Sequence, residues 1–308
     1  MIISSGCCMI FIVTNQGCKV CVVIFGDGTP DFKLAAKRLG KQVENLQIFS
    51  KVAVLDSNSL RQISTRYRND LIKISTLTTY PLYFRAIKPW AILHFMEENN
   101  GFFDVIFYLD AGCEIPNNII TRLQLNHLVS KSFQSGSIAE ITEYKETQYS
   151  RRNLIDRFGS VSWANAQGQV QSTWSMFKNT DFNRTFMKEW IELSNPINRF
   201  WQDPKGSELN DQYEDFVENR WDQSIFSLLY KKYNLYVKRT YWEFGGRFGN
   251  LRGVSIPIHA TRNKTGLSKL PSYHESNFIA ILSLFLNFFL DISRPFSIKL
   301  KVKKIKNT

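Results

Sequence analysis

Hydrophobic residues along this chain fall into two kinds of segment. Continuous apolar runs rich in branched and aromatic residues occupy positions 20–25, 52–55 and 105–109. Runs of this length without alternation are typical of strands buried on both faces of a sheet. Positions 32–46 carry apolar residues at helical spacing among Lys and Glu, which predicts an amphipathic helix. The order strand, helix, strand predicts a parallel sheet with right-handed crossovers.

The later segments continue this alternation of strands and helices. Predicted strands cover 137–141, 170–177 and 235–240. Predicted helices cover 117–131 and 183–194, and two more are expected, one that ends at Glu98 and one that begins near Asp222. No Pro/Gly/Ser-rich linker and no internal repeat divides the 308 residues. We therefore predict one α/β domain over 18–275, with a mostly parallel, Rossmann-type sheet flanked by helices. An extension covers 1–17, and an amphipathic helix with a basic tail covers 276–308.

Residues 142–165 have no clear period. They are polar and aromatic, and we expect a loop there. Such a loop can be mobile and close over an acceptor, or it can be structural.

One carboxylate stands where the central apolar run ends. Asp110 follows residues 105–109 directly, so it lies at the carboxyl edge of the predicted sheet, where ligands of open α/β folds bind. Ala111 and Gly112 after it allow a ligand or backbone to approach closely. The alternative is that Asp110 only caps the helix predicted to follow.

A second carboxylate stands at the start of a later helix. Apolar residues at positions 225, 226, 228, 229 and 233 form the stripe of a packed helix, and Asp222 falls in its first turn. There it is oriented by local N–H groups and stabilised by the helix dipole, as a general base must be. A plain N-cap has the same properties, and both interpretations stay open.

Several residues are candidates for binding a nucleotide or its diphosphate. Gly26 and Asp27 follow the first strand, Asp56 ends the second, and Arg85 and Lys88 stand three apart, as on one helical turn. The loop after the first strand has neither a GxxxxGK[ST] nor a GxGxxG pattern. An ordinary turn and a solvated basic pair are the alternatives.

A late basic segment adds further candidates. His259, Arg262 and Lys264 follow a glycine-rich stretch and can close over a diphosphate. A single His is more often a hydrogen-bonded core residue than a ligand.

The positive charge is concentrated near one end of the chain. The formal net charge is +12, and residues 294–308 contain six Lys or Arg and no acid. This distribution favours an anionic membrane surface as partner over a nucleic-acid groove. Apolar residues 278–290 form about 21 Å of helix, shorter than the roughly 30 Å of a bilayer core, so we expect this helix to lie on a membrane. The alternative is a helix packed on the domain with a solvated tail.

Four motifs occur in an order typical of one family. They are Lys88-Pro89, Tyr108-Leu109-Asp110-Ala111-Gly112-Cys113-Glu114, Arg220-Trp221-Asp222-Gln223-Ser224 and His259-Ala260-Thr261-Arg262-Asn263-Lys264. On these motifs, over residues 20–265, the chain resembles GT-A-fold glycosyltransferases of the nucleotide-diphospho-sugar transferase superfamily. Its relatives of this type build cell-surface polysaccharide or lipo-oligosaccharide.

The resemblance implies a nucleotide-sugar donor and a Mn²⁺ or Mg²⁺ ion held by an Asp-x-Asp element. Here Gly112 stands where the second acid belongs, so the implied metal ligands are Asp110, Glu114 and His259, or binding is metal-independent. The implied donor-binding residues also include Ala111, Gly112, Arg262 and Lys264. By the same resemblance Asp222 is the base that activates the acceptor hydroxyl in an inverting displacement.

These observations together predict a glycosyltransferase that moves sugar from a nucleotide diphosphate to a glycan or glycolipid hydroxyl. An odd count of five cysteines favours a reducing compartment, and we expect a cytoplasmic enzyme on the inner face of a membrane, without a nucleic-acid partner. One alternative is a non-catalytic basic protein that binds anionic polymer or membrane. Another is a degenerate homologue that only binds sugar.

Overall fold

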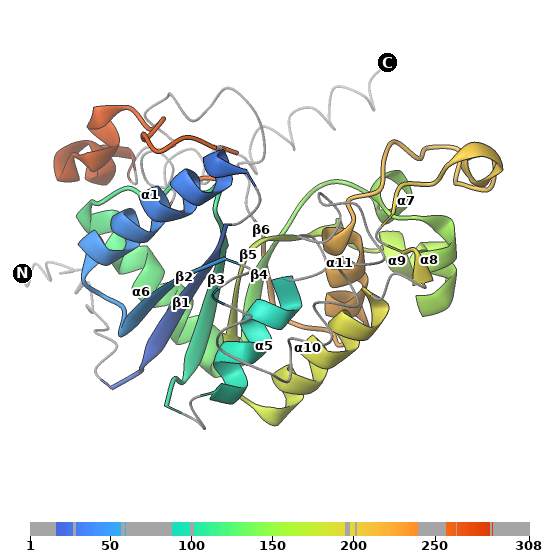
Figure 1. Ribbon diagram of the computed structural model, residues 1–308, viewed down its shortest axis with the longest axis horizontal. Coiled ribbons are helices and arrows are strands. Elements are labelled where there is room, and N and C mark those ends of the chain that lie inside the picture. Colours follow the sequence, from blue (N-terminus) through green and yellow to red (C-terminus); the bar gives the residue numbers. More distant parts are fainter. Residues whose placement is uncertain are drawn as a thin grey trace, which may run out of the picture.

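The fold is a six-stranded sheet between two layers of helices (Figure 1). The computed structural model describes residues 17–26, 29–56, 59, 88–98, 102–194, 198–200, 202–239, 257–262, 264–283 and 285. The strands are β1 (Val20–Phe25), β2 (Lys51–Leu55), β3 (Val105–Asp110), β4 (Ser137–Ile141), β5 (Val170–Lys178) and β6 (Val237–Arg239). The predicted strands are therefore all present, with small shifts at their ends.

The sheet is mostly parallel, as predicted. Its strand order is β2-β1-β3-β5-β4-β6. β1 pairs parallel with β2 and β3, and β4 pairs parallel with β6. Only β5 runs the other way, antiparallel to both β3 and β4. The beginning of β5 therefore lies at the same edge of the sheet as the end of β3.

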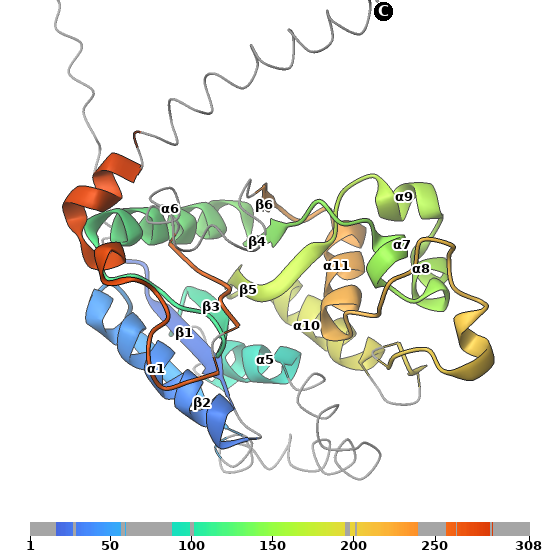
Figure 2. The same ribbon diagram turned by 90° about the horizontal axis from the view of Figure 1, so that it is seen from above.

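Helices cover both faces because the central strands are apolar on both sides. The main helices are α1 (Pro30–Leu46), α5 (Lys88–Glu98), α6 (Ile119–Ser135), α10 (Asp181–Leu193) and α11 (Asp222–Lys232). Alternate residues of β1 enter two separate cores. One core lies under α1 and α6, and the other lies under α5, α10 and α11 (Figure 2). This explains why β1 is an unbroken apolar run.

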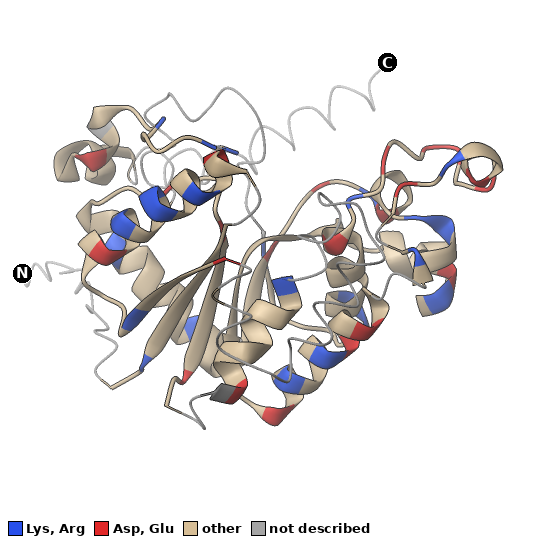
Figure 3. Cartoon of the chain, viewed as in Figure 1, with Lys and Arg blue, Asp and Glu red and all other residues tan. Residues whose placement is uncertain are grey.

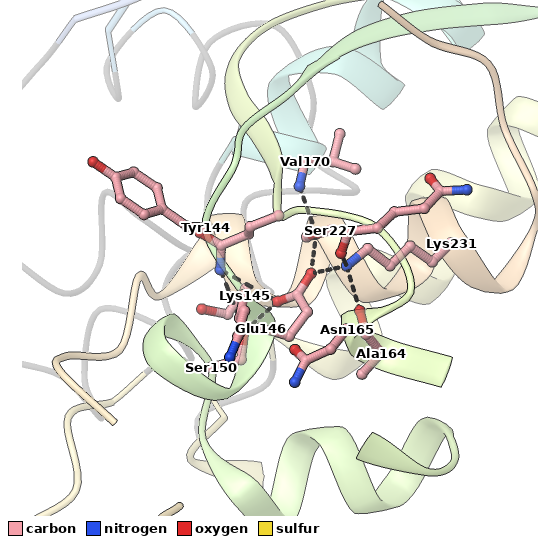
Figure 4. Close-up of polar contacts among 12 residues, drawn as sticks. Tyr144, Lys145, Glu146, Ser150, Ala164, Asn165, Val170, Ser227 and Lys231 are labelled. Atoms are coloured by element: carbon pink, nitrogen blue, oxygen red, sulfur yellow. Dashed lines mark hydrogen bonds and ion pairs between the residues drawn. The ribbon is translucent and has the colours of Figure 1, made fainter. Parts of the chain in front are cut away.

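Residues 142–165 form three short helices, so the predicted loop is wrong. They are α7 (Glu146–Tyr149), α8 (Arg152–Phe158) and α9 (Val161–Asn165). Glu146 is fully buried, and one carboxylate oxygen lies 2.7 Å from Lys231 Nζ of α11 (Figure 4). Helices of four to seven residues are too short to show a hydrophobic period, and their stability comes from such tertiary contacts.

The last described segment crosses α1 and ends beside α6. Arg38 of α1 donates to the Thr265 carbonyl at 2.7 Å, and Asn118, which caps α6, donates to the His274 carbonyl at 2.7 Å. A short 3₁₀ helix, η4 (Ser272–Glu275), precedes helical residues 277–283 and 285. Among the described residues, no helix combines the length and apolarity needed to cross a bilayer. Residues 1–16 of the predicted extension and residues 286–308 of the predicted tail lie outside the described residues.

Candidate active site

Two carboxylates and one ammonium group meet at the carboxyl edge of the sheet. Lys88 Nζ lies 3.0 Å from Asp110 Oδ1 and 2.8 Å from Asp222 Oδ2. Lys88 is the first residue of α5, Asp110 ends β3, and Asp222 begins α11. Three elements far apart in sequence thus deliver their charged groups to one point, and the two predicted acids face each other across Lys88.

Neutral groups complete this cluster. The Ser172 hydroxyl, near the start of β5, donates to Asp222 Oδ2 at 3.0 Å. Lys88 Nζ also lies 3.1 Å from both the Ser172 carbonyl and its hydroxyl oxygen. The Tyr108 hydroxyl donates to Asp110 Oδ1 at 2.9 Å. A buried charge is stable only when it is paired and hydrogen-bonded. These contacts therefore stabilise the charged forms of Lys88 and the two carboxylates below the surface.

The cluster opens toward solvent at Asp110. The side chain of Asp110 is 36% exposed, whereas those of Lys88 and Asp222 are 9% and 11% exposed. Two carboxylates stand against a single ammonium, so Lys88 offsets the charge of one acid. The accessible acid is the one at the sheet edge, where a ligand of this fold class approaches.

The pKa values reflect burial and mutual attraction. Burial lowers the pKa of Lys88, but the Asp110 and Asp222 carboxylates outweigh burial and raise it above its usual range. Burial raises the pKa of Asp110, and the Lys88 ammonium opposes that rise. Burial and the adjacent Asp110 raise the pKa of Tyr108 well above that of an ordinary phenol. At neutral pH Lys88 is therefore charged and Tyr108 is a neutral donor.

The backbone immediately before Asp222 is strained. Trp221 has φ 52° and ψ −115°, a conformation that costs a residue with a side chain about 1–3 kcal/mol. The Arg220 N–H donates to the Ser224 hydroxyl at 3.1 Å, and the Trp221 indole donates to Asp203 at 3.1 Å, which together hold the turn. Strain of this kind is maintained at sites where a side chain must be aimed, and here that side chain is Asp222.

Glu114, a predicted metal ligand, instead hydrogen-bonds to residues 259–269 and holds them beside the segment that follows β3. Its backbone pairs with that of His259 through two 2.9 Å hydrogen bonds. Its carboxylate accepts from the Thr261 and Ser268 hydroxyls and the Lys269 N–H at 2.7–2.8 Å. Burial raises the pKa of Glu114, but these three hydrogen bonds outweigh burial and hold the pKa below its usual range.

His259 likewise does not lie where a metal ligand would have to be. Its side chain is fully buried, and its ring centroid lies 5.1 Å from that of His274 in an edge-to-face arrangement. Among the described residues, no three His, Cys, Asp or Glu side chains form a group able to hold a metal ion. The set Asp110, Glu114 and His259 therefore does not fit a three-ligand metal site, and only Asp110 of the three belongs to the charged cluster.

Two predicted cations do lie near the carboxyl edge. The Thr261 hydroxyl donates to the Gly112 carbonyl at 3.2 Å, which places the neighbouring Arg262 beside the turn that follows Asp110. Lys264 Nζ lies 5.1 Å from the centre of the Phe32 ring, at the start of α1. Arg262 and Lys264 are both exposed. They are available to a ligand in a way that the enclosed Lys88 is not.

The other predicted donor-binding residues have local structural partners. Asp56 Oδ1 accepts from the N–H and the hydroxyl of Ser59, each at 2.6 Å, and so caps the turn after β2. Ala111 is buried, and its carbonyl accepts from Arg38 at 3.2 Å. Asp27 and Arg85 lie outside the described residues.

Gly26 is required by close packing at the end of β1. A methyl group added there would meet the Ala36 methyl at 2.4 Å and the Phe32 carbonyl oxygen at 2.7 Å. Gly26→Ala is therefore expected to lower the free energy of unfolding by about 1–3 kcal/mol, measured by urea denaturation. The matched control is Gly266→Ala, whose added methyl meets only Leu34 at 3.7 Å. Equal stability of the two variants would contradict this account.

Two residues of the cluster were not predicted from the sequence. Tyr108 belongs to the apolar run, but it stands two residues before Asp110 and so shares its face of the strand. The two-residue spacing could therefore have indicated that Tyr108 lies beside Asp110. Ser172 is brought to Asp222 only by the antiparallel placement of β5, and no local pattern indicates it.

Comparisons with known proteins find distant structural neighbours, and two of them are informative for the class of protein. No family model matches the chain, and no curated protein matches it. Both neighbours are glycosyltransferases. One takes part in the glycosylation of the major capsid of PBCV-1, with 8% identity and a TM-score of 0.32, covering 57% of this chain and 66% of that chain. The other is apo mouse xyloside xylosyltransferase 1, with 11% identity and a TM-score of 0.38, covering 72% of this chain and 84% of that chain.

Proposed function

We propose that this chain is a glycosyltransferase that moves a sugar from a nucleotide-diphosphate sugar to a hydroxyl of a glycan or glycolipid acceptor. The observation that supports it is the pair Asp110 and Asp222, held together by Lys88 at the carboxyl edge of the sheet. One acid is accessible at the edge, and the other is enclosed and aimed by a strained turn. Sugar transfer by direct displacement needs a group that takes the proton of the acceptor hydroxyl, which Asp222 can supply, and groups that hold the donor, to which Asp110 is accessible.

In the proposed reaction Asp222 accepts the proton of the acceptor hydroxyl. The acceptor oxygen forms a bond to the anomeric carbon, the bond from that carbon to the diphosphate oxygen breaks, and the nucleoside diphosphate leaves with the electron pair. Lys88 and Ser172 hold Asp222 Oδ2, which leaves Oδ1 to take the proton. Inversion at the anomeric carbon follows from a single displacement of this kind.

Arg262 and Lys264 are proposed to bind the leaving diphosphate. Both are exposed cations beside the β1 and β3 ends, and positive charge stabilises the negative charge that develops on the leaving group. Asp110 is proposed to orient the donor sugar through a hydroxyl. No step is assigned to a metal ion, because Glu114 and His259 do not join Asp110 in a ligand set.

The charge distribution does not favour the alternative of a non-catalytic basic binding protein. Figure 3 shows acidic and basic positions interspersed along the described helices. A protein that tracks a polyanion instead gathers its cations along the path of the polymer.

Donor binding is testable by thermal shift. UDP-, GDP-, ADP- and dTDP-sugars are screened with and without Mn²⁺, and one donor is expected to raise the melting temperature because it binds only the folded state. At a hundredfold excess over its Kd the gain is about 2.7 kcal/mol. Asp110→Asn is expected to abolish most of this shift.

The control for this screen is Asp181→Asn, because that side chain is 98% exposed on α10 and away from the cluster. The absence of any shift with all four donor classes would contradict the proposal. A shift without sugar transfer would instead favour a degenerate homologue that only binds sugar.

A further inference from the structure

The helix that ends the described chain turns its large apolar side chains away from the protein. Its small residues Ala280 and Ser283 are fully buried, and Ala280 packs on Ile120 of α6. The outward side chains are those of Phe278, Ile281, Leu282 and Phe285, which are 75%, 41%, 41% and 57% exposed. We call these four residues the apolar ridge. Their spacing of three, four and seven residues places them on one face of the helix.

This orientation is the reverse of that of an ordinary surface helix. A surface helix of a globular protein buries its apolar stripe and exposes polar residues. Here a serine faces the protein and two phenylalanines face outward. Exposed apolar area of this kind marks a surface that a partner covers.

The ridge is held in a fixed direction by contacts at the start of α6. The Asn117 N–H donates to Glu275 at 2.8 Å, and the Ile119 N–H donates to the Asn277 side chain at 2.7 Å. Figures 1 and 2 show this segment in red at the edge of the molecule, beside α6. The first turn of the helix is therefore anchored, and the ridge does not need to rearrange before binding.

We propose that the apolar ridge inserts into the surface of an anionic lipid bilayer. The residues that follow it in sequence support this occupant, because positions 294–308 contain six Lys or Arg and no acid. An apolar helix face joined to a polybasic segment is the two-signal arrangement that holds peripheral proteins on anionic lipid. A second copy of the chain is a poorer occupant, because pairing two ridges brings two sets of six positive charges together.

The proposed lipid binding does not depend on the proposed sugar transfer. Vesicle binding needs neither a donor nor Asp222. A failure of this inference therefore leaves the proposed chemistry untouched, and the two are tested separately.

The test is co-sedimentation of the full chain with sucrose-loaded vesicles of phosphatidylcholine, with or without phosphatidylglycerol. Wild type is expected to bind the anionic vesicles at least tenfold more tightly than the neutral ones, since each basic residue near an anionic surface adds about fivefold. Binding is expected to weaken as NaCl rises. The combined variant Phe278→Ser, Ile281→Ser, Leu282→Ser and Phe285→Ser is expected to weaken binding to anionic vesicles at least tenfold.

The matched control is Leu209→Ser with Val217→Ser, because those side chains are 54% and 63% exposed but lie away from the ridge. This control is expected to bind as wild type does. A second variant is expected to lose the preference for anionic lipid; it combines Lys299→Gln, Lys301→Gln, Lys303→Gln, Lys304→Gln and Lys306→Gln. Undiminished binding of the ridge variant overturns the inference, and so does a ridge-dependent dimer seen by sedimentation without lipid.

Discussion

Replacing Asp222 by Asn is expected to lower kcat for sugar transfer by about 10²–10⁴-fold, the usual contribution of a positioned general base. The amide has the shape of the carboxylate, and its oxygen can still accept from Ser172 and Lys88, so the cluster keeps its geometry. The variant loses the ability to take the acceptor proton, and Lys88 keeps Asp110 as its charged partner. The measurement is the initial rate with the donor identified by thermal shift, under saturating donor and acceptor.

Two readouts separate a lost base from a damaged fold. The Asp222→Asn variant should show the same donor-induced thermal shift as wild type, because Asp110, Arg262 and Lys264 are unchanged. The exposed control Asp181→Asn should retain full kcat. If Asp222→Asn turns over at the wild-type rate, Asp222 is not the base, and its role is reduced to pairing with Lys88 and Ser172 in the buried cluster.

The sheet and the two acids were predictable because their signals are local. A buried strand can be recognised in the sequence as an apolar run, and Asp110 is the first polar residue after such a run. Asp222 likewise precedes a stripe of apolar residues, and the structure places it in the first turn of α11. Their meeting was predictable from topology, since strand ends and helix starts gather at one edge.

The remainder depends on contacts between distant residues. Lys88 was predicted to meet a diphosphate, but the structure encloses its ammonium between Asp110 and Asp222, more than 20 and 130 residues away in sequence. Glu114 follows Asp110 closely enough to suggest a second metal ligand. Its side chain instead binds Thr261, Ser268 and Lys269. No pattern in the sequence around Glu114 indicates these partners, because they lie about 150 residues further along the chain.

Residues 142–165 show the same limit most clearly. Glu146 looks like a solvated acid in a polar stretch, yet it is the centre of a buried network. Ser227 and Lys231 of α11 both donate to its Oε1, while Ser150 donates to Oε2 at 2.7 Å (Figure 4). Lys231 Nζ also donates to the carbonyls of Ala164 and Gln167 at 2.7 and 3.1 Å. This network joins α7 and the end of α9 to α11, which carries Asp222 at its other end.

Replacing Glu146 by Ala is therefore expected to lower the free energy of unfolding by about 3–5 kcal/mol, measured by urea denaturation. The Glu146 and Lys231 side chains are 0% and 6% exposed, so the variant leaves a buried ammonium without its counter-charge. The comparison is Glu189→Ala, which breaks the neighbouring ion pair with Lys232. Those side chains are 24% and 43% exposed, and the expected cost is roughly 1 kcal/mol or less.

A double-mutant cycle distinguishes the ion pair from general packing loss. Lys231→Met removes the buried charge, and in the Glu146→Ala background it is expected to restore part of the lost stability, because no unpaired ammonium remains. The resulting coupling between the two sites should fall within about 0.5–3 kcal/mol, the range for residues in direct contact. Additive losses would mean that Glu146 acts through packing alone. A cost for Glu146→Ala no larger than that for Glu189→Ala would mean that the short helices are held to α11 by other contacts.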